Sequence, residues 1–246
     1  MARKIVIANL KGGVGKTNVC INLAMFLTAL GKRVLLIDLS PQGDASFSLG
    51  INASPNFIGD VLLQKIRPQV AIKSTSYFGF DVMPSFSGLD SAINNLRNVK
   101  RPELRLKKAI ENLEEDYDFI IIDTPPEFDL LILNALYSAD ELIIPIQAEY
   151  LAMRSAKQLL DLIQKRNIKI KKISALITMY GWRSKISRNI SKTARDDLSI
   201  NVLNSIIPRA TILAQTGESK EPILKVSPNS RAARAYRQLA EEVVGK

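Results

Sequence analysis

The alternation of short apolar runs with helical patterns predicts an α/β fold with a mostly parallel, twisted sheet. Two further observations support this prediction. The apolar runs have the length of strands, and the intervening segments repeat their apolar residues at helical spacing. Strands that alternate with helices form parallel sheets covered by helices on both faces. Because we find no repeat, low-complexity tract or linker-like segment, we expect one domain over residues 1–246.

The individual elements follow from this pattern. We expect strands at Lys4–Asn9, Arg33–Asp38, Phe80–Pro84, Phe119–Asp123, Glu141–Ile146, Ile173–Met179 and Asn201–Ile207. We expect helices at Asn18–Leu30, Pro102–Glu115, Leu151–Lys165, Ser184–Leu198 and Asn229–Val244. Gly31 closes the first helix, and a proline in the first turn favours the second. The stretch between residues 39 and 78 is apolar and rich in turns, and we assign no regular helix to it.

The composition excludes several classes of protein. Apolar residues make up 46% and charged residues 24% of the 246 residues, which is typical of globular domains. Histidine is absent, so a Ser-His-Asp triad and a histidine-ligated metal are excluded. Cys20 is the single cysteine, which excludes an internal disulfide and a cysteine-based metal site. We expect neither a signal peptide nor a membrane span, because the apolar runs are too short.

The basic charge is concentrated in the last part of the chain. The formal net charge is +10, but residues 1–150 hold 15 basic and 17 acidic side chains. Residues 151–246 hold 19 basic and 7 acidic side chains. This asymmetry indicates a polyanionic partner, either nucleic acid or an anionic membrane surface. A basic surface that serves only solubility is the alternative.

A glycine-rich segment between the first strand and the first helix predicts a phosphate-binding loop. The segment is Lys11-Gly12-Gly13-Val14-Gly15-Lys16-Thr17, followed by Asn18. Glycines let backbone N–H groups turn toward phosphate oxygens, and the helix that follows presents its positive end. Lys16 can reach the terminal phosphates, and the Thr17 hydroxyl can ligate Mg²⁺. Leu10 stands where the usual P-loop pattern has its first glycine, and Lys11 is an additional cation.

Three motifs in order resemble the deviant Walker A ATPases of the ParA/MinD type. They are the KGGVGKT segment at 11–17, DLSPQ at 38–42 and DTPP at 123–126. The resemblance extends over essentially the whole chain and includes Gln147, Glu149, Ile207-Pro208-Arg209 and Ser230-Arg231. It implies a P-loop NTPase fold and the cofactors ATP and Mg²⁺. It also implies an ATP-dependent homodimer in which Lys11 reaches the phosphates bound by the partner subunit.

The resemblance and the chemistry of the residues together assign roles in the site. Asp123 ends an apolar strand, as a carboxylate that holds Mg²⁺ through water does, and Asp38 ends another strand in the same way. We therefore expect Thr17, Asp38 and Asp123 at the metal. The resemblance implies that residues 11–18 bind ATP, that Lys11, Lys16, Asp38 and position 40 act in catalysis, and that Met179, Pro208 and Arg209 contact the adenine.

Ser40 departs from the family pattern, which usually has a second aspartate at this position to place the attacking water. A serine hydroxyl can hydrogen-bond a water molecule but cannot accept its proton as a carboxylate does. Two interpretations remain: slow hydrolysis with a long-lived ATP-bound dimer, or participation of another carboxylate such as Asp44.

Sequence features favour one subgroup of the family. The lone Cys20 argues against iron–sulfur carriers, and a single tyrosine near the end, Tyr236, argues against tyrosine kinases. Residues 240–246 lack the apolar face of a membrane-binding helix, and few residues precede the first strand, so we expect no N-terminal helix-turn-helix. The short ParA type, which binds DNA without sequence preference, remains.

Two groups of basic residues are candidates for contacts with DNA phosphates. The first group lies on or just before one predicted helix, and the second repeats every third residue on the last helix. These groups are Arg183, Lys185, Arg188, Lys192 and Arg195, and Arg231, Arg234 and Arg237. Such contacts require only cations on a common surface. Solvated helix faces are the alternative, and Ile212 stands where the family usually has an arginine.

We therefore expect an ATPase that partitions plasmid or chromosomal DNA. The resemblance implies a ParB-like centromere-binding partner that stimulates turnover, and a cytoplasmic location on the nucleoid. Two alternatives remain: a membrane-positioning ATPase like MinD, and a regulatory switch that binds ATP but hydrolyses it very slowly.

Overall fold

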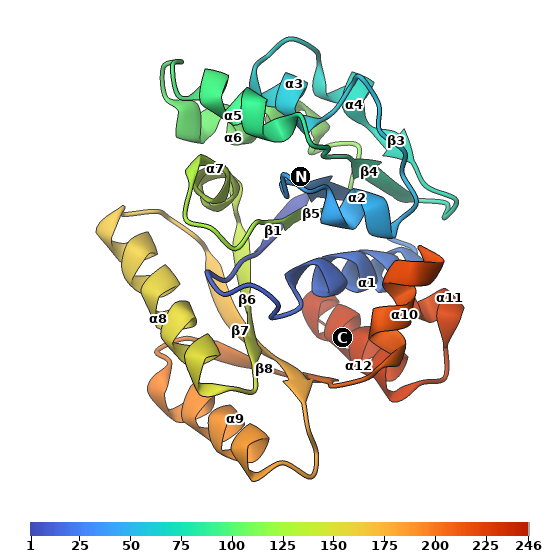
Figure 1. The fold of residues 1–246 in the computed structure, drawn as a ribbon, viewed down its shortest axis with the longest axis vertical. Helices are drawn as coiled ribbons and strands as arrows, with labels where there is room; N and C mark the ends of the chain where they lie inside the picture. Colours follow the sequence, from blue (N-terminus) through green and yellow to red (C-terminus); the bar gives the residue numbers. More distant parts are fainter. Residues whose placement is uncertain (246) are drawn as a thin grey trace.

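Eight strands form one sheet in the order β3-β4-β2-β5-β1-β6-β7-β8 in the computed structural model (Figure 1). The structure describes residues 1–245, without the side chains of residues 150–152. All strand pairs are parallel except β3 with β4. The strands are β1 (Arg3–Ile7), β2 (Val34–Asp38), β3 (Lys73–Ser74), β4 (Phe80–Met83), β5 (Phe119–Asp123), β6 (Glu141–Gln147), β7 (Lys172–Tyr180) and β8 (Asn201–Pro208). The predicted α/β class with a mostly parallel sheet is confirmed.

Helices cover both faces of this sheet. One face carries α3 (Ile58–Leu62), α4 (Pro68–Ala71), α5 (Leu89–Leu96), α6 (Arg105–Ile110), α7 (Leu130–Ser138), α8 (Tyr150–Lys165) and α9 (Lys185–Asp197). The other face carries α1 (Lys16–Ala29), α11 (Ile223–Val226) and α12 (Arg231–Val244). In Figure 1, α8 and α9 lie to the left of the strands and α1 and α12 to the right. Two apolar cores, one on each face, hold these layers together.

The central strands are buried on both faces, which explains their continuous apolar runs. Every residue of β2 and of β5 is buried. Strands of this kind occur where helices cover both sides of a parallel sheet. Asp38 and Asp123 end these strands and pair in register, and Ile7 at the end of β1 pairs with Asp123. The parallel arrangement therefore brings the loops after β1, β2 and β5 together at one end of the sheet.

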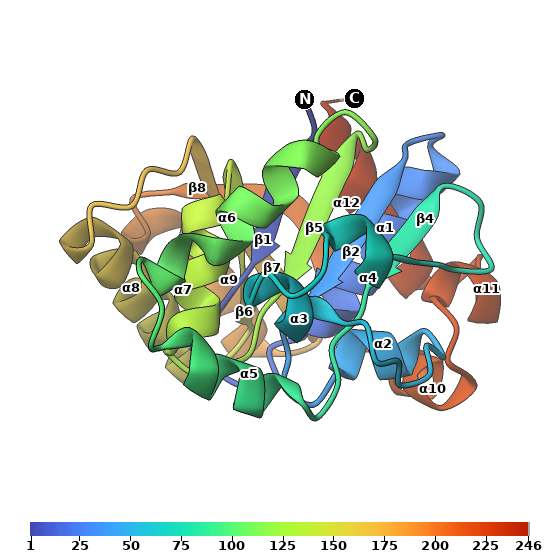
Figure 2. The same ribbon diagram turned by 90° about the horizontal axis from the view of Figure 1, so that it is seen from above.

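Short helices occupy the loops at this end. They are α2 (Asp44–Ser48) after β2 and α10 (Ile212–Ser219) after β8. Figure 2 shows the arrow of β5 pointing toward the end of the molecule where α2 and α3 lie. Within residues 1–245, no helix has the length and apolar character needed to cross a membrane.

The predicted strands and long helices agree with the structure to within a few residues. The exceptions are short or weakly patterned. The segment 102–115 is divided into a 3₁₀ turn (Pro102–Leu104), α6 and a second 3₁₀ turn (Glu111–Leu113). The stretch between residues 39 and 78, to which we assigned no helix, contains α2, α3 and α4 as well as β3. We also missed α5, α7, α10 and α11.

Candidate nucleotide-binding site

The loop between β1 and α1 is shaped by two glycines and anchored at its start by Asn9. Gly13 and Gly15 have φ values of +71° and +90°, which glycine adopts without strain. The buried Asn9 side chain donates to the Pro145 carbonyl at 2.7 Å and accepts from the Lys11 amide at 3.0 Å. Residues 16 and 17 form the start of α1, so the loop ends at the positive end of a 14-residue helix. This geometry is suited to a phosphate group.

Lys16 is buried beside carboxylates without forming an ion pair. Its side chain is 7% exposed, and its Nζ donates to the Lys11 carbonyl at 3.3 Å. Burial lowers the pKa of the Lys16 ammonium, and the charges of Asp123 and Asp44 oppose this effect. Among the ion pairs of the described residues, none involves Lys16. A buried cation of this kind is a strong attractor for an anion.

Asp123 has one buried oxygen atom that lacks a partner. The Cys20 thiol donates to its Oδ1 at 3.4 Å, whereas Oδ2 accepts no hydrogen bond. Burial raises the pKa of Asp123, and the neighbouring Thr17 hydroxyl and Lys16 charge oppose this rise. A buried carboxylate oxygen without a partner requires a ligand, because leaving it unpaired is unfavourable. Asp123 and Thr17 therefore fit the expected magnesium site.

Asp38 has a different environment from Asp123. Its Oδ1 accepts from the Ser40 amide at 2.9 Å, and its Oδ2 accepts from the Ser46 amide at 2.9 Å and hydroxyl at 2.7 Å. Burial, followed by the charge of Asp123, raises the pKa of Asp38, and the hydrogen bonds from Ser46 and Ser40 oppose it. In this structure Asp38 therefore organises the loop after β2. Its expected role at the metal stays a prediction.

The described residues hold no group of three or more Asp, Glu or Cys side chains that could bind a metal ion by themselves. A cation beside Thr17 and Asp123 therefore needs further ligands from water and from the phosphates of a nucleotide. Mg²⁺ is commonly bound in this way, through one or two protein oxygens and the substrate.

Ser40 is fixed in the loop after β2 by four hydrogen bonds. Besides its amide bond to Asp38, its carbonyl accepts from the Ser85 hydroxyl at 2.6 Å and the Gly43 amide at 2.9 Å, and its own hydroxyl donates to Asp44 Oδ2 at 2.9 Å. Gly43 allows this close packing: it has a φ of +66°, and a Cβ atom there would lie 2.4 Å from the Ser85 carbonyl oxygen. Hydrogen bonds that involve side chains therefore define the conformation of this loop.

Lys11 contacts its own subunit in this structure. Its Nζ lies 3.2 Å from Oε1 of Gln147, the last residue of β6, and 3.2 Å from Oε2 of Glu149, which directly precedes α8. Glu149 also lies 3.9 Å from the exposed Arg209 guanidinium. The resemblance had indicated Gln147 and Glu149 without assigning them a partner. The structure pairs them with the additional lysine of the loop.

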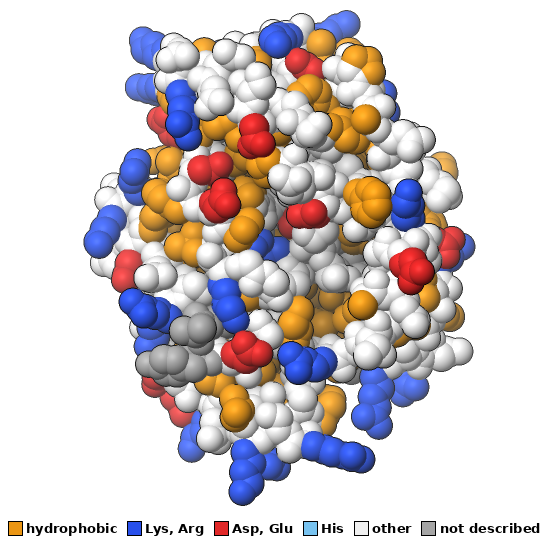
Figure 3. All heavy atoms as spheres, viewed as in Figure 1, with side chains coloured by type: hydrophobic (Ala, Val, Ile, Leu, Met, Phe, Trp, Pro, Cys, Tyr) orange, Lys and Arg blue, Asp and Glu red, His pale blue; other side chains and the backbone are white. Residues whose placement is uncertain are grey.

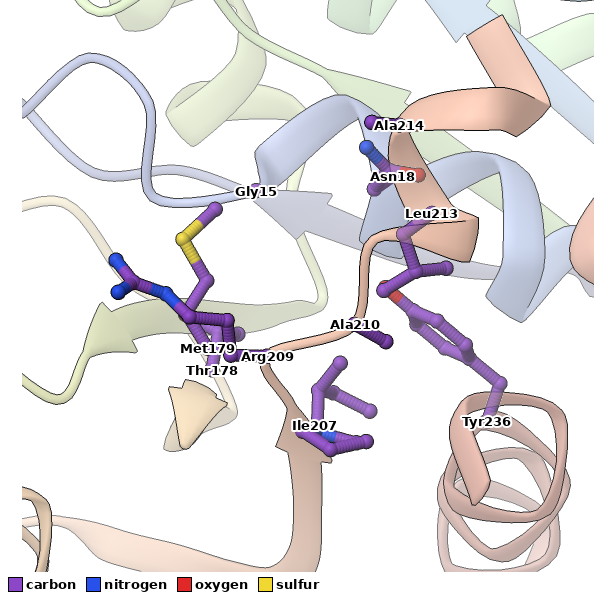
Figure 4. Close-up of a pocket in the computed structure, with 11 residues that line it drawn as sticks. Gly15, Asn18, Thr178, Met179, Ile207, Arg209, Ala210, Leu213, Ala214 and Tyr236 are labelled. Carbon is purple, nitrogen blue, oxygen red and sulfur yellow. The ribbon is translucent and has the colours of Figure 1, made fainter. Parts of the chain in front are cut away.

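An apolar pocket of about 220 Å³ lies beside the start of α1 (Figure 4). Met179 lines it with a φ of +51°, at an irregularity in the pairing of β7 with β8 that turns its side chain toward Gly15. Pro208, the last residue of β8, and Arg209, which follows it, line the same pocket. The residues expected at the adenine thus line one cavity next to the phosphate loop. The remaining lining residues are Gly15, Asn18, Thr178, Ile207, Ala210, Leu213, Ala214 and Tyr236.

Tyr236 is a pocket residue that sequence reasoning missed. It is 1% exposed, and no protein group among those described hydrogen-bonds its hydroxyl. Figure 4 shows the hydroxyl directed toward Leu213 and the Asn18 side chain. The sequence contains no local signal for this position, because Tyr236 reaches the pocket from α12, more than 200 residues after the phosphate loop. Sequence reasoning also did not assign Cys20, Ser46 and Ser85 to the site, where they donate to Asp123, Asp38 and Ser40.

The two groups of basic residues lie away from this pocket and on opposite faces of the sheet. The basic residues of both groups are exposed. Figure 3 shows Lys and Arg side chains gathered along the lower rim of the molecule, over α9. However, α9 belongs to the core on one face and α12 to the core on the other, and both helices pack against the edge strand β8. Arg195 also donates to the Val202 and Leu203 carbonyls at 3.3 Å.

Comparisons with known proteins agree with the fold and the site. The family model described as AAA domain matches residues 2–176. The chain is 37% identical to the sporulation initiation inhibitor protein Soj of Bacillus subtilis, over 99% of this chain and 98% of Soj. It is 33% identical to the chromosome partitioning protein ParA of Caulobacter vibrioides, over 99% and 94%.

A solved structure also covers nearly the whole chain. The cobyrinic acid a,c-diamide synthase of Mycobacterium smegmatis, with a bound ATP analogue and magnesium, has a TM-score of 0.86 and 34% identity. The alignment covers 99% of this chain and 95% of that protein. The similarity to Soj and ParA extends over the full length of the chain, and the ordered motifs and the arrangement of residues 11–18 with Asp123 agree with it. We conclude that the chain belongs to the ParA/MinD family of ATPases.

Proposed function

We propose that this chain binds ATP and Mg²⁺ and hydrolyses ATP as part of DNA partition. The observation that carries the proposal is the pair formed by Lys16 and Asp123: among the described residues, Lys16 is a buried cation without an ion pair, and the buried Oδ2 of Asp123 has no partner. A triphosphate with its metal satisfies both groups at once. The bound ATP analogue and magnesium in the similar synthase structure support this assignment.

The residues of the site have distinct tasks in this proposal. The backbone N–H groups of residues 12–17 and the Lys16 ammonium bind the phosphates, and Thr17 and Asp123 hold the metal. Bound magnesium neutralises negative charge on the phosphate oxygens. The apolar pocket with Met179, Pro208 and Tyr236 receives the adenine. Basal hydrolysis is slower than with an aspartate at this position, because Ser40 itself cannot accept the proton of the attacking water.

ATP also drives dimerisation in this proposal. Lys11 releases Gln147 and Glu149 and reaches the phosphates bound by the partner subunit, where it supplies positive charge during phosphoryl transfer. The dimer then binds double-stranded DNA without sequence preference through the exposed cations of α9 and α12. A ParB-like centromere-binding protein stimulates turnover, and DNA binding keeps the protein on the nucleoid. The similarity to Soj and ParA supports this role.

Co-sedimentation with DNA and with anionic liposomes tests the proposed role. The protein is incubated with ATP and Mg²⁺, with ADP and Mg²⁺, or with no nucleotide. We expect it to sediment with DNA in the presence of ATP, and to stay in the supernatant with liposomes in all three conditions. Sedimentation with liposomes but not with DNA would support a membrane-positioning role in place of DNA partition.

A further inference from the structure

The loop after β2 contains a hydroxyl–carboxylate pair at the same end of the sheet as the phosphate-binding loop. The Ser40 hydroxyl donates to Asp44 Oδ2 at 2.9 Å. Ser40 is 5% exposed, and its backbone amide and carbonyl are held by Asp38 and Ser85, so its hydroxyl projects from a fixed backbone. Asp44 is the first residue of α2 and is exposed. Ser40 is thus held on a fixed backbone, and Asp44 is accessible to solvent.

Asp44 is electrostatically part of the same site. Its negative charge acts to raise the pKa of the Lys16 ammonium and of the Asp123 carboxylate, so Asp44 is electrostatically coupled to both groups. None of the ion pairs among the described residues involves Asp44. Its carboxylate accepts a side-chain hydrogen bond only from Ser40 within the described part of the chain. The other carboxylate oxygen of Asp44, Oδ1, therefore accepts no hydrogen bond within the described part of the chain.

The other carboxylates around the loop are already engaged. Asp38 accepts three hydrogen bonds that fix the loop. Asp123 is directed at the expected metal site, and Glu149 pairs with Lys11 and Arg209. The chain has no histidine that could replace them. A hydroxyl alone is a poor proton acceptor, but a hydroxyl bonded to a carboxylate can pass a proton onward.

We propose that Ser40 and Asp44 act together on the water that attacks ATP, with Ser40 as the contact and Asp44 as the final proton acceptor. The water oxygen forms a bond to the γ-phosphorus while the bond from that phosphorus to the β–γ bridging oxygen breaks. The proton of the water passes to Ser40 Oγ, and the Ser40 proton passes to Asp44 Oδ2. The products are phosphate and ADP, and Asp44 returns the proton to solvent. This inference rests on the proposed ATPase function.

Single-turnover hydrolysis of ATP by the full-length protein tests the inference. We expect Asp44→Asn and Ser40→Ala each to lower the rate constant by about 10- to 100-fold, because general base catalysis contributes about 10²- to 10⁴-fold when it is fully efficient. Affinity for a fluorescent ATP analogue, measured in parallel, stays within about threefold of the unmodified protein. Asp90→Asn is the matched control, because Asp90 is also an exposed aspartate in the first turn of a helix.

Two double variants separate a functional pair from a structural contact. Ser40→Ala with Asp44→Asn should be no slower than the slower single variant, because residues that act as a unit are not additive. Ser40→Asp with Asp44→Asn moves the carboxylate to position 40 and should restore at least the unmodified rate. Residues in a merely structural contact are also non-additive, so the rescue by Ser40→Asp is the result that such a contact would not give.

The outcomes distinguish this inference from the proposed function. An unmodified protein that binds ATP but releases no phosphate would overturn both. An active unmodified protein with an equally active Asp44→Asn variant would overturn the Ser40–Asp44 pair alone. Loss of activity in Asp44→Asn without rescue by the carboxylate at position 40 would also contradict it.

Discussion

The Nζ atom of Lys11 lies 3.2 Å from Oε2 of Glu149 in the same subunit. The Glu149 side chain is half exposed, so the free energy of this pair is modest, at most about 1 kcal/mol. The pair nevertheless holds the one lysine that is expected to act on the partner subunit. Any dimer in which Lys11 contacts the partner's phosphates must first break this interaction.

Glu149→Gln should therefore favour ATP-dependent dimerisation. Removing the charge lowers the free energy needed to release Lys11, and we expect the dimer dissociation constant to fall by up to about fivefold per contact. Analytical ultracentrifugation with ATP and with ADP measures this effect. Lys11→Ala should abolish the ATP-dependent dimer and preserve ADP binding. A weaker dimer for Glu149→Gln would show that the pair supports the interface instead of restraining Lys11.

Lys16→Ala should abolish ATP binding. The buried ammonium is the main cation of the phosphate loop, and its removal leaves Asp123 and Asp44 without a counter-charge near the phosphates. We expect the dissociation constants of both ATP and ADP to rise by at least about 100-fold in titration calorimetry. Lys11→Ala serves as the comparison, since it removes a cation from the same loop. Equal loss of ADP affinity in both variants would mean that Lys11 acts as an ordinary residue of the loop.

Tyr236→Phe should weaken nucleotide binding without destabilising the fold. The substitution removes a hydroxyl that has no protein partner among the described residues, from a side chain that lines the pocket, and it keeps the aromatic ring in the core. A single hydrogen bond contributes about 0.5–1.5 kcal/mol, so the dissociation constants of ATP and ADP should rise by about two- to tenfold. Unchanged affinity for both nucleotides would show that the hydroxyl does not contact them.

The parts of the site that could be predicted from the sequence are those encoded locally. The glycines at 12, 13 and 15, Lys16 and Thr17 are adjacent in the chain, and Asp38 and Asp123 each follow an apolar strand. Parallel pairing then brings both carboxylates to one end of the sheet. No tertiary information beyond the sheet topology is needed for this step.

The remaining features depend on contacts between distant segments. The Ser85 bond to Ser40 and the position of Tyr236 join residues 45 or more apart in sequence. Helix α7 was missed because its residues are almost all apolar, so they show no helical periodicity, although Asp129 caps it through the Leu131 and Ile132 amides. Helical spacing predicted the exposed arginines of α9 and α12, but not that the two helices lie on opposite faces of the sheet.

Glu242→Gln should lower the stability of the protein in a pH-dependent manner. Glu242 accepts from the Asn204 amide at 2.8 Å and from the Ser205 amide at 2.9 Å and hydroxyl at 2.7 Å, which ties α12 to β8. Burial would raise the pKa of Glu242, but these hydrogen bonds outweigh it, and the pKa lies below the ordinary value of 4.5. The stabilisation is therefore present above that value and is lost as the pH falls through the lower pKa of the folded state.

Urea denaturation at several pH values measures this effect. At pH 7 we expect the free energy of unfolding to fall by about 1 kcal/mol in Glu242→Gln, since the carboxylate is partly exposed. The difference from the unmodified protein should shrink as the pH falls below 4.5. Glu241→Gln is the control, because no described hydrogen bond involves the Glu241 carboxylate. A difference that is independent of pH would contradict the assignment to the ionised carboxylate.

The basic residues of α9 and α12 provide the test of DNA binding. Arg188 and Arg234 are exposed on helices that flank the edge strand β8 from opposite faces. In an ATP-bound dimer each substitution removes two cations. Each lost phosphate contact reduces the slope of log K against log salt concentration by about 0.9, so we expect Arg188→Ala to reduce it by up to about 2. Binding to two unrelated duplexes should weaken equally, and ATP affinity should stay unchanged.

The separation of the two helices makes Arg188→Ala and Arg234→Ala informative as a pair. Fluorescence anisotropy over a salt series, with ATP present, gives the slope for each variant. Arg67→Ala, which removes an exposed arginine before α4, is the control and should leave the slope unchanged.

A reduced slope for both variants means that the DNA contacts extend around the β8 edge. A reduced slope for Arg188→Ala alone would confine the contacts to the face that carries α9, because Arg234 then faces solvent. Unchanged slopes for both would identify these arginines as solvated surface, and a strong preference for one duplex would contradict binding without sequence preference.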